Sequence, residues 1–258
     1  MRIRLVNPNT TAAMTARIEA NARAVAGPGV VVEAVTSSMG PASIESHYDE
    51  ALSVPGLLAA VADGEALRVD GYVVACFGDP GLEAARELAR GPVVGIAEAA
   101  MHAAMLLGRG FSVVTTLERT AGRAWDLAAR YSAAGACRGV HACDIPVLDL
   151  DRDPDLADRV AAVAGAALAR DGSDVIVLGC AGLADLAAAL SDRLGVPVVD
   201  GVAAATLFVR ALVTMGLRTS TRCEFAPPPP KPYAGALAGF AVQAGSANSP
   251  VSRGSSAM

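Results

Sequence analysis

The chain repeats itself, and this repeat constrains its fold more than any other feature. Two segments, VVACFGDPGLEAARE (73–87) and IVLGCAGLADLAAAL (176–190), each run from an apolar stretch through a cysteine and small residues into a helix-like stretch. Their cysteines, Cys76 and Cys180, lie 104 positions apart. The block from Ile3 resembles the block from Phe111, and the block from Gly91 resembles the block from Gly195. Three blocks in the same order at nearly constant spacing predict two related halves.

Short runs rich in Val or Ile alternate with Ala-rich stretches along the chain. Runs of this kind are typical of strands buried on both faces, and the alternation predicts parallel α/β layers. The predicted strands are Ile3–Val6, Val30–Ala34, Gly71–Ala75, Val93–Ile96, Phe111–Val114, Asp174–Leu178 and Val196–Val199. The predicted helices are Ala12–Ala24, Ala51–Val61, Leu82–Ala89, Ala97–Leu107, Thr120–Arg130, Asp155–Ala169, Leu183–Leu194 and Ala203–Met215.

The fold class predicted is therefore α/β, with two pseudo-symmetric domains that each hold a parallel sheet. The first domain is expected to span residues 1–97 together with about 206–225, and the second to span 98–205. The segment 226–258 is rich in Pro, Gly and Ser and has no periodicity, so we expect a poorly ordered tail.

Composition excludes several classes of function. Hydrophobic residues make up 53% of the 258 residues and the net charge is −5, which argues against disorder and against nucleic acid as a partner. Lys231, in a Pro-rich stretch, is the only lysine, so Schiff-base chemistry and a phosphate-binding P-loop are not expected. Three scattered histidines argue against a multi-histidine metal site, and we expect no metal and no organic cofactor.

The chain has five cysteines, an odd number, and no C-x-x-C pair. Its N-terminus lacks an apolar signal region. No long charge-free apolar span indicates a membrane helix. We therefore expect a cytoplasmic protein with reduced thiols, no membrane partner, and assembly into a homo-oligomer.

The repeat places Cys76 and Cys180 at the carboxyl ends of two strands, where open parallel sheets bind ligands. Each cysteine begins a Gly-containing strand-to-helix turn, and we expect the N–H groups of the following helix to lower the thiol pKa towards neutrality. Two such thiols facing one cleft suit a racemase, in which one base removes a proton and the other supplies one to the opposite face. A free cysteine is also a common core residue. Cys137, Cys143 and Cys223 have no repeat context and are interpreted as bystanders.

Four motifs in order resemble the hydantoin racemase family, which includes allantoin racemases and belongs to the cofactor-independent aspartate/glutamate racemase superfamily. They are Asn7–Thr10, Gly40–Ser46 with Tyr48–Ala51, Ala75–Leu82 and Leu178–Gly182, and the resemblance covers roughly residues 1–217. It implies two α/β domains with the active site between them and the two cysteines as the acid/base pair. By the same resemblance, the substrate pocket is lined by Asn9, Ile44, Phe77, Gly78, Thr115, Thr116, Ala181 and Gly182.

Several of these residues also have a structural interpretation. Asn9 suits a cyclic ureide through its donor and acceptor, yet it also suits a cap for the helix from Ala12. Thr115 and Thr116 are equally typical of caps near Thr120, and Phe77 of a core. Asp200, at the same sheet edge, is interpreted as a cap or loop residue.

The motif loops contain no Arg or Lys, which favours a small neutral cyclic ureide over a dicarboxylate. Arg119 and Arg123 are expected on a solvated helix face. C5–H of a hydantoin is acidic because its removal gives an enolate, which backbone N–H groups can stabilise.

Other functions remain open from the sequence. Within the superfamily, an aspartate or glutamate racemase or a maleate isomerase would act on carboxylates, and an arylmalonate decarboxylase needs one catalytic cysteine. A non-enzymatic ligand-binding protein of the same fold needs no paired thiols, and a redox protein needs sulfurs within bonding reach.

Overall fold

Two four-stranded parallel sheets form the framework of the computed structural model, which describes residues 1–242. The first sheet has the order β2-β1-β3-β4 and the second has the order β6-β5-β7-β8, so the predicted repeat is present as one topology used twice. The strands of the first sheet are β1 (Arg2–Asn7), β2 (Val31–Thr36), β3 (Gly71–Val74) and β4 (Val93–Gly95). Those of the second are β5 (Phe111–Thr115), β6 (Cys137–Ala142), β7 (Val175–Leu178) and β8 (Val198–Val199).

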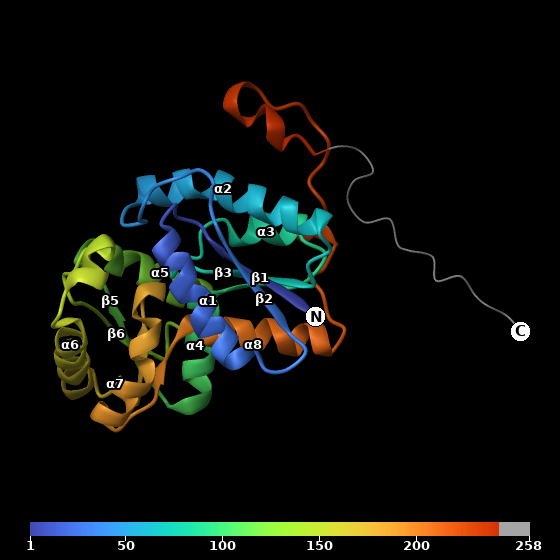
Figure 1. The fold of residues 1–258 in the computed structure, drawn as a ribbon. Coiled ribbons are helices and arrows are strands. Elements are labelled where there is room, and N and C mark those ends of the chain that lie inside the picture. Colours follow the sequence, from blue (N-terminus) through green and yellow to red (C-terminus); the bar gives the residue numbers. More distant parts are fainter. Residues whose placement is uncertain (243–258) are drawn as a thin grey trace, which may run out of the picture.

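Helices cover both faces of each sheet (Figure 1). The α-helices are α1 (Ala12–Ala26), α2 (His47–Ala66), α3 (Leu82–Leu88), α4 (Ile96–Leu107), α5 (Ala121–Arg130), α6 (Leu156–Asp171), α7 (Ala187–Leu194) and α8 (Gly201–Thr214). Short 3-10 helices are η1 (Glu118–Thr120), η2 (Val147–Arg152), η3 (Ala181–Leu186), η4 (Cys223–Phe225) and η5 (Gly235–Phe240). The predicted α/β fold class is confirmed.

The two halves share one continuous core. The main cluster of buried side chains runs from Leu5 and Val73 in the first sheet to Phe111 and Val177 in the second. Helix α4 packs against β7 of the second sheet and against α8, which in turn contacts α1, β3 and β4 of the first. A smaller cluster lies on the other face of the second sheet, under α6 and α7.

One strand was not predicted, and two predicted helices begin at clearly different residues in the structure. Strand β6 was missed because its sequence, CRGVHA, lacks a Val/Ile run and forms a partly exposed sheet edge. Helix α2 extends four residues before the predicted start because Ser46 caps it, accepting a hydrogen bond from Asp49 N. The predicted helix Leu183–Leu194 begins instead as the 3-10 helix η3.

Residues 226–242 extend away from the rest of the molecule and carry one 3-10 turn, η5 (Figure 1). The rest of the predicted tail, 243–258, lies outside the described residues. The domain boundaries stay a prediction. Within residues 1–242, no helix combines the length and apolarity needed to cross a membrane.

Candidate active site

Cys76 lies two residues beyond β3, at the carboxyl edge of the first sheet. Its turn closes tightly, because the N–H of Asp79 donates to the carbonyl oxygen of Cys76 at 2.9 Å. The backbone N–H of Gly78 is directed at the Cys76 sulfur. The sulfur is therefore held in a short turn between β3 and α3.

Cys180 occupies the equivalent place in the second half, two residues beyond β7. Its sulfur caps η3 and accepts a hydrogen bond from the N–H of Gly182 at 3.4 Å. Each cysteine thus interacts with the N–H two residues further along, so the repeat extends to the local contacts of the sulfurs. Both are free thiols.

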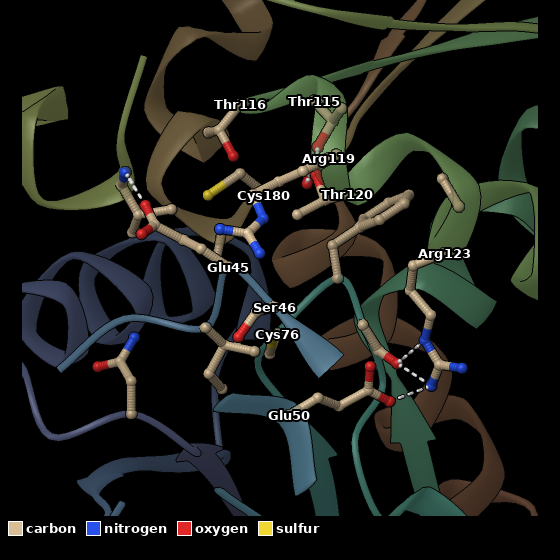
Figure 2. Close-up of a pocket in the computed structure, with 18 of the residues that line it drawn as sticks. Glu45, Ser46, Glu50, Cys76, Thr115, Thr116, Arg119, Thr120, Arg123 and Cys180 are labelled. Carbon is tan, nitrogen blue, oxygen red and sulfur yellow. Dashed lines mark hydrogen bonds and ion pairs between the residues drawn. The ribbon is translucent and has the colours of Figure 1, made fainter. Parts of the chain in front are cut away.

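Both cysteines line one cavity of about 200 Å³ at the junction of the halves, a volume suited to a small molecule (Figure 2). Of the sequence-predicted pocket residues, the structure brings together Asn9, Ile44, Phe77, Gly78, Thr115, Thr116 and Ala181 on its walls. Gly182 is not among the described lining residues, because it packs against Leu150 and Met14.

The expectation of lowered thiol pKa values was wrong. Burial raises the pKa of Cys76 to about 12, outweighing the N–H of Gly78. Burial likewise raises the pKa of Cys180 to about 11, outweighing the N–H of Gly182. One hydrogen bond does not compensate for removing a thiolate from water. The negative charge of Cys180 is among the smaller causes that raise the pKa of Cys76.

Arg119 and Arg123 were expected on a solvated helix face. Arg119 is exposed, as expected, but lies in the 3-10 helix η1, whereas Arg123 is only partly exposed, and both side chains also line the cavity. Arg119 lies in η1, and Arg123 lies in the first turn of α5. Arg123 pairs with Glu50 at 2.5 Å and donates to the carbonyl oxygen of Gly78, so it joins the two halves. Arg119 points into the cavity (Figure 2) and makes no hydrogen bond or ion pair with any residue in 1–242.

The sequence did not predict one part of the cavity wall. It comes from the segment before α2 and from the first turn of that helix: Glu45, Ser46, His47 and Glu50. Glu45 accepts a hydrogen bond from Val147 N in the second half at 2.7 Å. The signal available was the segment Gly40–Ser46, which carried the family resemblance without assigned roles, except for Ile44.

The remaining predicted residues combine structural and cavity contacts. The side-chain oxygen of Asn9 accepts hydrogen bonds from Asn7 and from Thr11 N. The expected helix cap is absent, because Thr11 occupies the N-cap position of α1 and no side chain caps the helix there. Thr115 Oγ1 donates to Gly179 O at 3.3 Å. Phe77 is 7% exposed and belongs to the core as well as to the cavity wall.

Three further residues named from the sequence lie outside the cavity. Asp200 caps α8, accepting hydrogen bonds from Val202 N and Ala203 N, as expected. Cys137 and Cys143 are buried away from the lining. Within residues 1–242, no three His, Cys, Asp or Glu side chains form a group suited to a metal ion.

The fold and the cavity define a class: a parallel α/β protein of two equivalent halves, with one free cysteine from each half on the wall of a shared small-molecule cavity. The chain belongs to the Asp/Glu/Hydantoin racemase family, whose sequence model matches residues 3–209. It is therefore an isomerase, a racemase of this family.

Relatives agree with this placement along nearly the whole chain. A hydantoin racemase of Rhizobium meliloti is 48% identical over 91% of this chain and 98% of its own length. One of Pseudomonas sp. (strain NS671) is 44% identical over 93% of this chain and 97% of its own length. The solved allantoin racemase from Klebsiella pneumoniae has a TM-score of 0.91 and 48% identity, covering 93% of this chain and 99% of its own. Arylmalonate decarboxylase, at 18% identity and a TM-score of 0.62, shares the fold.

Proposed function

We propose that the protein racemises 5-substituted hydantoins, either hydantoin-type substrates or allantoin, by proton transfer at C5 between Cys76 and Cys180. The observation that carries this proposal is the placement of one cysteine from each half on the wall of one small cavity. The names of the relatives support the substrate class.

In the proposed step the ring lies with C5 between the two sulfurs. The thiolate of one cysteine takes H5, so the C5–H bond breaks, an S–H bond forms, and the electron pair moves into the ring as an enolate. The thiol of the other cysteine then gives its proton to the opposite face of C5 and becomes the thiolate. The products are the mirror-image hydantoin and a cysteine pair whose protonation states have been exchanged.

Cavity groups are available to hold the ring. The amide nitrogen of Asn9 donates no hydrogen bond within residues 1–242, while its oxygen is held by Asn7 and Thr11. The side chain is therefore fixed in place with two N–H donors free for a ring carbonyl. A donor to that carbonyl stabilises the enolate more than the ground state, because the oxygen gains charge.

The thiol pKa values fit a strong base that is present in small amount. Raised pKa values keep most of both thiols protonated near neutral pH, but each thiolate that forms is a stronger base than one of ordinary pKa. Removing H5 from a weak carbon acid needs such a base, and returning a proton needs the protonated partner.

The decisive test uses Cys76→Ser and Cys180→Ser, with polarimetry for racemisation and NMR in D2O for exchange of H5. Each variant is expected to lose racemisation. Each should still exchange H5 of a single enantiomer, the one whose C5–H faces the remaining cysteine, and the two variants should select opposite enantiomers. Racemisation by a Cys76→Ala, Cys180→Ala double variant would refute the assignment.

The cavity also bears on the substituent at C5. Arg119 offers an unpartnered guanidinium, which favours a substituent carrying a hydrogen-bond acceptor, such as the ureido group of allantoin. It also removes the argument that the site lacks cations, so the choice of a hydantoin over a dicarboxylate rests on the relatives. Polarimetry should therefore compare allantoin, 5-benzylhydantoin and L-aspartate. We expect racemisation of allantoin to be the fastest and none of L-aspartate.

A further inference from the structure

Asp79 is a buried carboxylate in the turn that carries Cys76, and it is not among the described residues of the cavity wall. It is 1% exposed, and a buried charge is costly unless it is fully hydrogen-bonded. Three donors converge on it: Ala97 N at 3.1 Å, Glu98 N at 2.9 Å and the hydroxyl of Tyr131 at 2.7 Å. Burial raises the pKa of Asp79 to about 7, while these donors favour the carboxylate.

These contacts join three parts of the molecule. The backbone N–H of Asp79 closes the Cys76 turn, and its carboxylate binds the first N–H groups of α4. Tyr131, at the end of α5, belongs to the second half. The carboxylate is thus a fixed link between the loop of one cysteine and the half that supplies the other.

The neighbouring backbone allows the Asp79 side chain only one position. A side chain at Gly95 would put its Cβ 2.2 Å from the carboxylate carbon, so only glycine admits this approach. Asp79 also has a φ of 44°, a left-handed conformation that Asp and Asn adopt more readily than most residues. Backbone and side chain are therefore both specified at this position.

We infer that Asp79 is a positioning residue, which anchors the Cys76 turn to α4 and Tyr131 and so sets the Cys76 sulfur against C5 of the substrate. This inference rests on the proposed function. It assigns to Asp79 no contact with the substrate and no proton transfer.

The test exploits the asymmetry between the cysteines. In Asp79→Asn, an amide group faces N–H donors while the volume and the backbone preference are kept. Cys76 then shifts and Cys180 does not, so racemisation should fall on the order of 10- to 100-fold. Cys180 should continue to exchange H5 without inversion. NMR in D2O should therefore show a raised ratio of exchange to racemisation for one enantiomer, the same one that Cys76→Ser exchanges.

Asp171→Asn is the matched control. Asp171 is also largely buried and accepts hydrogen bonds from Ser112 and His141, but it lies at the end of α6 away from the cavity. This variant should lower the midpoint of thermal unfolding without changing the ratio of exchange to racemisation. Tyr131→Phe removes one donor to Asp79 and should shift the ratio in the same direction by a smaller factor. If Asp79→Asn does not fold, Tyr131→Phe provides the test in its place.

Equal losses of exchange for both enantiomers, or an unchanged ratio in Asp79→Asn and Tyr131→Phe, would overturn the inference. Failure of the proposed function looks different, because the unsubstituted protein would then racemise none of the hydantoins.

Discussion

At the scale of single residues, the balance between burial and hydrogen bonding decides the protonation state of the two cavity thiols. Each sulfur receives one N–H, from Gly78 or from Gly182, as a thiolate site would require. The loss of water around the sulfur is the larger effect. We therefore expect the free protein to hold two thiols at neutral pH, with thiolate formed from a small fraction.

Alkylation measures this balance directly. Since both pKa values are raised well above 9, the thiolate fraction should grow about tenfold for each unit between about pH 6.5 and 9. Peptide mass spectrometry after iodoacetamide treatment should show Cys76 and Cys180 following this rise without a plateau. Alkylation of the exposed Cys223 in the same sample serves as a control that the reagent is active. A plateau at either cysteine near pH 7.5 would mean that the N–H donors prevail over burial.

The sequence predicted the cavity residues that belong to the repeat. It did not predict those that reach the cavity only through the packing of the fold. Cys76 and Cys180 follow equivalent strands, so the shared pattern placed both at the cavity. Arg119 carries no such pattern. Its side chain is exposed and also lines the cavity, which depends on how η1 packs at the sheet edge rather than on local sequence.

At the scale of elements, periodicity and caps explain what was predicted and what was not. Strands with a Val/Ile run were located to within one or two residues, because two buried faces demand such a run. Edge strand β6 pairs with one neighbour and tolerates Gly139 and His141, so its sequence lacks the signal. The early start of α2 depends on the cap at Ser46, within a loop that lacks helical periodicity.

The N-cap of helix α8 matters for stability, because α8 follows the last strand of the second sheet and packs against α1, α4 and β3. Asp200→Ala removes the acceptor for Val202 N and Ala203 N and should lower the free energy of unfolding by about 1 kcal/mol. Urea unfolding measures the change. Asp200→Asn retains a capping oxygen and should lose less, and an equal loss in both variants would show that the charge matters rather than the cap.

At the scale of the whole molecule, the shared core predicts that the two halves unfold together. Val73 in β3 and Val177 in β7 are equivalent positions of the repeat, both fully buried and both members of the same cluster. Contacts such as that between Arg123 and Glu50 also cross the junction. Two independent domains joined by a linker would have separate cores instead.

Trp125, the only tryptophan, lies in α5 of the second half and reports on that half alone. Val73→Ala in the first half should lower the free energy of unfolding by about 2 kcal/mol, because it removes two buried methyl groups. If the halves form one cooperative unit, Trp125 fluorescence and far-UV circular dichroism should shift to the same lower urea midpoint. Val177→Ala, the equivalent change in the second half, should do the same. A Trp125 transition that responds to Val177→Ala but not to Val73→Ala would show that the halves unfold separately, and that the site between them is held by surface contacts rather than by a common core.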